Sequence, residues 1–292
     1  MRPTPAFLIL ALALGGCRHE GVRPTPALVP TASAAVAADD NLNAVLWMQT
    51  SPEYRANALQ TYRAATRQLD RALKDRQWDA LDASERANAA RGLPPAVIFD
   101  VDETVLDNSP YQARLVAAGT EFDEAQWQAW VREQKATAIP GVLEFAKAAQ
   151  ARGIALFFVS NRAVQLKEAT IANLRAVGLP VKDDAFLGLG TAVPECEQTG
   201  SDKTCRRQLV GRTHRVLMQF GDQLGDFVRV QPNTPAARDA VFETHAAWIG
   251  ERWWMLANPS YGSWEPALFD NEYRKPRDAR RDAKRAALKL AR

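Results

Sequence analysis

Four short apolar runs after residue 95 restrict the fold of this chain most strongly. They have the length and composition of strands and alternate with stretches of helical pattern; they cover residues 96–100, 154–160, 216–220 and 252–256. Each run is largely apolar, so both of its faces need cover, as in a parallel sheet with helices on both sides. The alternation predicts an α/β fold with a doubly wound parallel sheet. A further short strand is expected at 185–187.

Helical patterns occupy the segments between and before these runs. Residues 140–152 and 164–177 have helical periodicity, and the second stretch ends at a Gly-Leu-Pro sequence that is typical of a helix terminus. Residues 41–90 also look helical, with Ser51 as the expected N-cap and Pro52 at the first helical position. Apolar residues then recur at helical spacing and predict one packing face, formed by Tyr54, Ala58, Tyr62, Ala65, Leu69 and Leu73.

The composition excludes several classes of protein. The chain has 292 residues, of which 47% are hydrophobic and 24% are charged. This excludes wholesale disorder and a disulfide-dense mini-protein. The net charge is only +3, whereas dedicated nucleic-acid binders carry a stronger and clustered basic signature. We therefore expect no nucleic-acid polymer as a partner.

The amino terminus has the pattern of an export signal. Arg2 precedes an unbroken apolar run at 6–14, which is too short to cross a bilayer as a helix and fits the core of a signal peptide. The run ends in Leu-Gly-Gly-Cys, which resembles the lipobox of bacterial lipoproteins, so Cys17 is the predicted lipidation site. An ordinary cleaved signal with an incidental cysteine is the alternative, but the small-x-small site at 35–37 lies too far from the apolar run.

Polar side chains gather where the predicted strands end, which is where open α/β sheets bind their ligands. The first strand leads into Asp100, Asp102 and Thr104, the second ends in Ser160 and Asn161, and a later strand runs into Asp222 and Asp226. Lys203 lies upstream of that later strand. One aspartate after a strand means little, because Asp is common in turns. Several such features in order are much harder to attribute to turns alone.

These residue types suit phosphoryl transfer. Carboxylates from neighbouring strands repel each other, and a divalent cation such as Mg²⁺ relieves that repulsion, with Asp100 and Asp222 as the natural ligands. Asp100 can also act as a nucleophile that forms an aspartyl-phosphate, and Asp102 can exchange a proton with the leaving group and with water. Ser160 and Lys203 would bind the phosphoryl oxygens. A solvated surface lysine is the alternative for Lys203.

The ordered motifs resemble those of the haloacid dehalogenase superfamily. The segments that carry the likeness are Asp100-x-Asp102-x-Thr104, Ser160-Asn161, Lys203 and Asp222-x-x-x-Asp226. Longer segments at 101–111, 158–162, 221–227 and 258–265 look like the class C acid phosphatases, which are bacterial outer-membrane lipoproteins that dephosphorylate nucleoside monophosphates. The likeness extends over nearly the whole mature body, including residues 47–56.

The resemblance implies a role for each motif residue. Asp100 would be the nucleophile and a Mg²⁺ ligand, Asp102 the general acid and base that also gives its backbone carbonyl to the metal, and Asp222 the third protein ligand. Asp226 would orient Lys203 or a metal-bound water. The phosphate would be held by Thr104, Ser160, Asn161 and Lys203. The family often has an acidic residue where this chain has Gly225.

Aromatic residues near the predicted sheet edge bear on the substrate. By the resemblance, Trp127 and Tyr261 would sandwich the base or nicotinamide ring of a nucleotide, and stacking of this kind tolerates different bases. Core packing is the expected role of Trp130 and Trp264. Tryptophan and tyrosine usually serve packing, which is also the alternative for the first pair.

The sequence and the resemblance together predict a segmented organisation. Residues 1–17 would be the lipoprotein signal and 18–38, which contain three prolines, a flexible tether. A helical segment would cover 39–92 and a haloacid-dehalogenase-like (HAD-like) core 93–275, with a small helical cap inserted near 108–138. The remaining residues, 276–292, form a predicted basic helix.

The odd cysteine count is explained by export. Cys17 would carry lipid, which leaves Cys196 and Cys205 in an oxidising compartment on either side of Lys203. We expect a disulfide between them that pins the segment of the phosphate-binding lysine, and two separate thiols are the alternative.

The predicted activity is that of a Mg²⁺-dependent acid phosphomonoesterase, similar to a 5′-nucleotidase, acting on nucleoside monophosphates or nicotinamide mononucleotide. A broad phosphatase or phosphotransferase is the second hypothesis, and a non-catalytic surface lipoprotein is the third. In the lipoproteins that the amino terminus resembles, an Asp after the lipidated cysteine would favour the inner membrane; this chain has Arg18 there, so the outer membrane is the expected location. The partners would be a small phosphomonoester, the membrane through the lipid anchor only, and, as an open option, a second copy of the chain.

Overall fold

A five-stranded parallel sheet forms the centre of the chain in the computed structural model, which describes residues 40–291. The strand order is β5-β4-β1-β6-β7, and every neighbouring pair is parallel. The strands are β1 (Pro95–Phe99), β4 (Ala155–Ala163), β5 (Phe186–Leu189), β6 (Arg215–Gly221) and β7 (Trp253–Met255). The predicted α/β class and all five predicted strands are therefore confirmed. β1 lies in the middle of the sheet, with later strands added on both of its sides.

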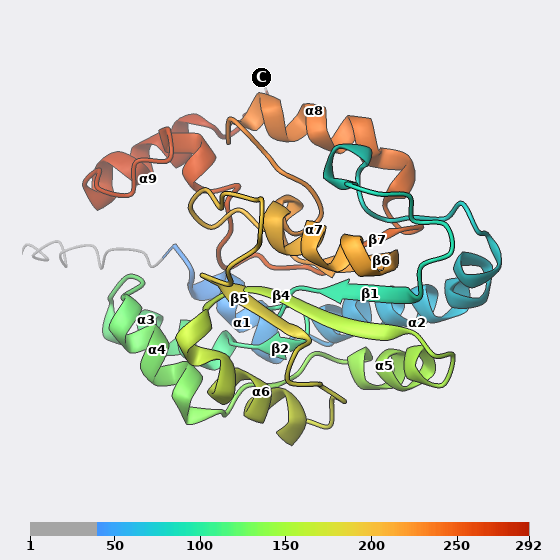
Figure 1. Ribbon diagram of the computed structural model, residues 1–292. Helices are drawn as coiled ribbons and strands as arrows, with labels where there is room; N and C mark the ends of the chain where they lie inside the picture. The colour runs from blue at the N-terminus through green and yellow to red at the C-terminus, as the bar shows by residue number, and fades with distance from the viewer. Residues whose placement is uncertain (1–39, 292) are drawn as a thin grey trace, which may run out of the picture. The chain divides into compact units, whose positions relative to one another are not determined.

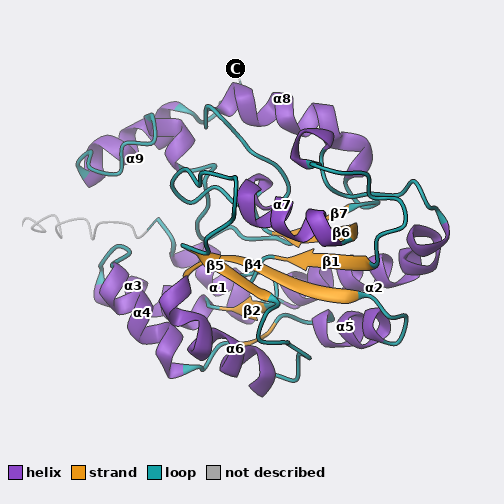
Figure 2. Ribbon diagram, in the orientation of Figure 1, coloured by secondary structure: helices purple, strands orange, loops and turns teal. Residues whose placement is uncertain are grey.

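Helices cover both faces of the sheet, as the apolar strands require (Figures 1 and 2). One face carries α2 (Pro52–Lys74), α5 (Val142–Gln150) and α6 (Lys167–Ala176), and the other carries α7 (Thr204–Thr213) and α8 (Pro235–His245). The side chains of β1 alternate accordingly. Val97 and Phe99 belong to one buried apolar cluster, whereas Ala96 and Ile98 belong to a second. This arrangement is the doubly wound architecture that the sequence predicts.

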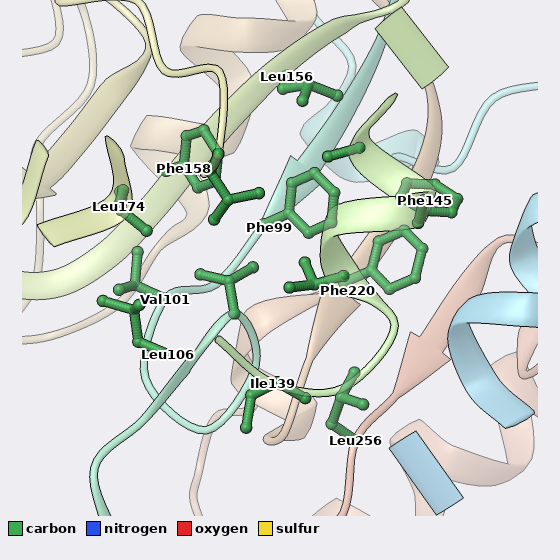
Figure 3. Close-up of a cluster of buried hydrophobic side chains, with 14 of the residues drawn as sticks. Phe99, Val101, Leu106, Ile139, Phe145, Leu156, Phe158, Leu174, Phe220 and Leu256 are labelled. Atoms are coloured by element: carbon green, nitrogen blue, oxygen red, sulfur yellow. The ribbon is translucent and has the colours of Figure 1, made fainter. Parts of the chain in front are cut away.

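Stacked aromatic rings occupy the larger cluster (Figure 3). The Phe99 ring stacks on Phe158 at 5.6 Å and on Phe220 at 4.9 Å between centroids, and it meets Phe145 edge-on at 5.8 Å. These four side chains come from β1, β4, β6 and α5, so they join three strands to the helix that covers them. All four are nearly inaccessible to solvent.

The segment between β1 and α5 forms a small cap. It contains β2 (Leu106–Asp107), α3 (Ser109–Ala118), α4 (Glu124–Glu133) and β3 (Thr137–Ala138). β2 and β3 pair antiparallel. The sequence predicts the helical insertion but not this two-stranded sheet, because two residues are too few to show a strand periodicity.

The amino-terminal segment is helical only up to residue 74. It contains α1 (Leu42–Thr50) and α2, and the Ser51 side chain caps α2 by accepting from the Tyr54 amide at 3.1 Å. The helical pattern read over 41–90 is wrong for its last part, where a single 3₁₀ turn at 83–85 is the only helical element. Arg215 explains the stop, because its guanidinium donates to main-chain carbonyls at the end of α2, including that of Ala72 at 3.0 Å. Arg215 therefore supplies hydrogen-bond donors to these carbonyls, which would otherwise need a further turn of helix to be satisfied.

The carboxyl-terminal basic segment forms α9 (Arg277–Ala286). The predicted signal peptide, the lipidation site Cys17 and the tether at 18–38 lie outside the described residues. Among residues 40–291, no helix has both the length and the apolar character that crossing a bilayer requires.

The aromatic cluster predicts a large stability loss on truncation. We expect Phe99→Ala to lower the free energy of unfolding by about 3–5 kcal/mol, because it removes a fully buried ring and leaves a cavity among its neighbours. Phe242→Ala on α8, where the ring is 45% exposed, should cost far less. Chemical denaturation of both variants checks the difference, and equal losses would contradict the assignment of Phe99 to the core.

Candidate active site

The strand-end segments that the sequence singles out converge on one cleft. Asp100 follows β1 directly and Asp222 follows its neighbour β6, so the two lie side by side at the carboxyl edge of the sheet. Lys203 immediately precedes α7. The cleft has a volume of about 1610 Å³, and its walls include all three residues together with Asp102 and Asp226.

A buried lysine joins two of these carboxylates. The ammonium of Lys203 bonds to Asp100 and, at 2.7 Å, to Asp226 Oδ1. The three side chains are only 5–7% exposed. Asp226 uses its second oxygen to accept from the backbone amides of Asp222 and Gln223, at 3.1 and 2.8 Å. Lys203 is therefore a buried ionic residue and not a solvated surface lysine, and Asp226 orients it.

The carboxylates outnumber the cation beside them. Oxygens of Asp100, Asp222 and Asp226 all lie within 4.8 Å of one another, and Lys203 supplies one positive charge. A divalent cation fits this donor set, since hard cations prefer carboxylate oxygens and would balance the excess negative charge. Among the described residues, the side chain of Asp102 does not belong to this group.

Burial, and after it the mutual repulsion of the carboxylates, raises the pKa values of Asp100 and Asp222. Burial raises the pKa of Asp100 to about 7, and neighbouring carboxylates add to the rise while Lys203 opposes it. Burial, with the charges of Asp226 and Asp100, also holds the pKa of Asp222 well above its usual value. Burial alone would lower the pKa of Lys203, but the attraction of Asp100 and Asp226 raises it, so the lysine stays charged.

Asp102 is oriented by groups from two other segments. Its Oδ1 accepts from Arg162 Nε at 2.9 Å and from Asn108 Nδ2 at 2.8 Å, and Arg162 Nη2 lies 2.8 Å from the same oxygen. Within residues 40–291, no side chain donates to Oδ2. The sequence does not indicate that Arg162 and Asn108 orient Asp102, although it places both in segments that resemble the family.

Asp222 is held by two amides. Asn258 Nδ2 and Gln223 Nε2 both donate to its Oδ2 at 2.8 Å, whereas no side chain of residues 40–291 donates to its Oδ1. Asn258 follows β7 and also accepts from the Ser260 amide at 2.9 Å. The sequence places Asn258 in a segment that resembles the family but does not indicate this contact, since a loop asparagine has many ordinary uses.

The predicted phosphate-binding residues fall into two groups. Asn161 and Lys203 line the cleft. Thr104 and Ser160 are fully buried beneath it: Thr104 donates to Asp100 Oδ2 over a long 3.4 Å, and Ser160 Oγ accepts from the Arg162 amide at 3.0 Å. Asn161 is positioned by Arg206, which donates to its Oδ1 at 2.7 Å.

Trp127 and Tyr261 both line the cleft and are partly exposed. Trp127 meets Tyr111 edge-on at 5.1 Å and lies under the Arg162 guanidinium at 5.5 Å. The Tyr261 hydroxyl bonds to Glu103, a fully buried carboxylate with a left-handed φ of 54°. Nothing in the sequence indicated this buried partner for Tyr261.

The two tryptophans expected to pack in the core behave differently. Trp130 is 2% exposed and donates its indole N–H to Asn108 Oδ1 at 2.8 Å. Trp264 is 41% exposed and lines the cleft, so its prediction as a core residue is wrong. It lies in the loop after β7, where no helix or strand covers it.

A disulfide joins Cys196 and Cys205, whose Cα atoms are 5.6 Å apart. Cys205 lies in the first turn of α7, two residues after Lys203. The bridge therefore ties the preceding loop to the helix that presents the lysine.

The fold and site define a class of α/β proteins that have an aspartate at the end of the central strand, a second aspartate two residues on, and a buried lysine bonded to the first. The chain belongs to the HAD superfamily, subfamily IIIB (acid phosphatase), because the model of that family matches residues 26–264.

Solved and curated relatives agree with this assignment. The structure of the class C acid phosphatase from Bacillus anthracis with tungstate bound matches with a TM-score of 0.75 and 32% identity, covering 86% of this chain and 98% of that one. Acid phosphatase 1 of Solanum lycopersicum is 31% identical over 45% of this chain and 51% of its own length. A stem 31 kDa glycoprotein of Glycine max is 27% identical over 45% of this chain and 51% of its own length. The chain spans about half the length of the curated relatives it matches.

The buried ion pairs of Lys203 with Asp100 and Asp226 predict a loss of stability when the lysine charge is removed. Lys203→Met should lower the free energy of unfolding by about 3 kcal/mol, because breaking a buried ion pair leaves uncompensated carboxylates. Lys182→Met, at an exposed lysine between α6 and β5, is the matched control and should change stability by no more than about 0.5 kcal/mol. Denaturant titration measures the free energy of unfolding of both variants. Equal small effects would mean that the charge of Lys203 does not stabilise the fold.

Proposed function

We propose that this protein is a Mg²⁺-dependent phosphomonoesterase that hydrolyses nucleoside 5′-monophosphates or nicotinamide mononucleotide through an aspartyl-phosphate. The observation that carries the proposal is the position of Asp100. Its carboxylate is bonded to Lys203, lies beside Asp222 and Asp226, and opens into a cleft whose walls include two partly exposed aromatic rings.

In the first step, Asp100 attacks the phosphorus while the bond from phosphorus to the substrate oxygen breaks. The departing oxygen takes a proton from Asp102, whose Oδ2 has no donor among the described residues. Lys203 and Asn161 line the cleft, so the lysine would offset the negative charge of the transferred phosphate and the asparagine amide would donate to its oxygens. Arg162 and Asn108 keep the Asp102 carboxyl aimed at the leaving group.

In the second step, Asp102 takes a proton from a water molecule as that water attacks the phosphorus. The bond between phosphorus and the Asp100 carboxylate breaks, which releases phosphate and restores both aspartates. One residue thus serves as acid and then as base, without any other group having to move into the site.

Asp100 and Asp222 would hold the metal through their side chains and Asp102 through its main-chain carbonyl. A bound Mg²⁺ supplies positive charge that neutralises the phosphate oxygens and the carboxylates around them. The free Oδ1 of Asp222, left open by Asn258 and Gln223, supports this assignment.

The nucleotide preference rests on the aromatic side chains. Trp127 and Tyr261 come from the cap and from the loop after β7, and both line the cleft. A planar base between them would gain stacking energy without being read for its hydrogen-bond pattern.

The location and the partners form part of the same proposal. The lipobox at Cys17 and the following Arg18 favour an outer-membrane lipoprotein that is held by its lipid anchor. Its substrate would be a small phosphomonoester that cannot cross the inner membrane, and a homodimer is left open.

A substrate panel tests the activity. The protein should release phosphate from nucleoside 5′-monophosphates only when Mg²⁺ is present, and a chelator should abolish turnover. Asp100→Asn should lower kcat at least ~1000-fold, because the nucleophile is lost. Asp183→Asn, at an aspartate 83% exposed on the surface, should retain activity. Full turnover by Asp100→Asn would refute the aspartyl-phosphate.

A broad phosphatase without nucleotide preference is the second candidate, since Trp127 already packs against Tyr111 and Arg162. If stacking selects nucleotides, Trp127→Ala should lower kcat/KM on a nucleotide by roughly 5–100-fold, the range expected for one stacked base. The loss on a small alkyl phosphate should be much smaller. Equal losses on the two substrates would favour the broad phosphatase.

A further inference from the structure

The cleft that contains Asp100 extends to a second, basic wall that the chemistry of a single phosphate does not use. One side of α9 lines this cleft through Arg277, Arg280, Arg281, Lys284 and Arg285, and Leu288 follows just after the helix. Figure 1 shows α9 and the cap helices α3 and α4 on the side of the sheet toward which β1 points. The basic wall and the acidic sheet edge therefore belong to one continuous space.

The spacing of these residues shows that the wall is one face of the helix. They recur at intervals of three and four, which is the periodicity of a single helix face. The acidic residues of α9, Asp278 and Asp282, do not line the cleft. The cations of α9 thus share the face that lines the cleft, and Arg277 and Arg285 among them remain exposed to solvent.

Three of the cations fix α9 in place. Arg280 bonds to both carboxylate oxygens of Glu121 in the cap at 2.7 Å. Lys284 lies 2.9 Å from Glu265, and Arg281 lies 2.6 Å from Asp40. These ion pairs reach three separate segments of the chain, so the basic wall has a defined position relative to the rest of the cleft.

Two further cations remain available to a ligand. Arg277 forms no ion pair or side-chain hydrogen bond with any residue of the described part of the chain. Arg229, which follows the Asp226 motif, is 47% exposed and has Asp202 only at 3.7 Å. Both guanidinium groups line the cleft, and a guanidinium binds phosphate oxygens in pairs.

The size of the cleft fits an extended ligand. Pockets for small ligands usually measure ~300–1000 Å³, whereas this one measures about 1610 Å³. Two exposed aromatic side chains, Trp264 and Tyr273, also line it. A mononucleotide at the sheet edge would leave this basic and aromatic part of the cleft unfilled.

From these observations we infer that the basic face of α9, with Arg277 and Arg229, is a subsite for a second phosphate of the substrate, one that is not transferred. The preferred substrates are then nucleotides that carry a terminal phosphomonoester and another phosphate farther along the molecule. This inference rests on the proposed phosphomonoesterase function and specifies its substrate class.

The test compares substrates that differ in the second phosphate. With the full-length protein and Mg²⁺, kcat/KM should be about five- to tenfold higher for a nucleoside 3′,5′-bisphosphate or a 5′-phosphorylated dinucleotide than for the matching 5′-monophosphate. The bisphosphate carries its second phosphate as a 3′-phosphomonoester and the dinucleotide as an internucleotide phosphodiester. Comparing the two substrates shows which of these groups the subsite prefers. The preference should shrink when the ionic strength is raised, because salt screens contacts between exposed charges.

Variants of α9 locate the effect. Arg277→Gln should reduce the preference to about twofold or less, whereas Arg274→Gln should leave it as in the unmodified protein, because Arg274 is exposed and does not line the cleft. Both residues lie at the surface, and thermal melting checks that both variants fold. An equal effect of the two variants would mean that the overall basic charge attracts the substrate, and it would overturn the subsite.

A binding measurement separates this inference from the proposed activity. Asp100→Asn protein should bind the bisphosphate more tightly than the monophosphate by a similar factor in calorimetry, and Arg277→Gln added to it should remove the difference. If no monoester is hydrolysed, the proposed function fails. The comparison of the two binding affinities still decides whether the second-phosphate subsite exists. Equal affinity or equal kcat/KM for the two nucleotides would overturn the second-phosphate subsite.

Discussion

The bond network of Lys203 with Asp100 and Asp226 is the interaction on which the rest of the site depends. It brings one cation to a sheet edge where three carboxylates meet with little access to solvent. Without that cation, the carboxylates at this edge would either take up protons or move apart. With it, the carboxylates remain close enough to share a divalent ion. The catalytic edge is thus an electrostatic balance that the fold maintains by burial.

Several structural features serve to keep that balance in position. The disulfide ties the loop before α7 to its first turn, where Lys203 lies. The amides of Asp222 and Gln223 fix the second oxygen of Asp226. Below the edge, the stacked rings around Phe99 hold β1 and its neighbours in register (Figure 3). A packed core that cannot shift is what allows like charges to be held at short distance.

The two ends of the cleft have opposite electrostatic character. The sheet edge is acidic and its carboxylates fit a divalent cation, whereas α9 presents cations from a helix that three ion pairs dock onto separate segments. Aromatic side chains lie along the same cleft, among them Trp127, Tyr261 and Trp264. The nucleotide that we propose as substrate, with a phosphate at one end, a planar ring and further negative charge, would be complementary to these three kinds of group.

The sequence by itself determined the fold class, the five central strands and the set of ordered motif residues, because burial on both faces and polar strand ends leave a direct mark on residue order. It also indicated the motif aspartates and Lys203, which are chemically distinctive at those places. Only the tertiary structure decided where α2 ends, since that stop depends on Arg215 from a distant strand. The same holds for Glu103 beneath Tyr261, for Asn258 on Asp222 and for the exposure of Trp264. Each of these is a contact or a lack of cover between segments far apart in the chain, and local periodicity carries no record of such distances.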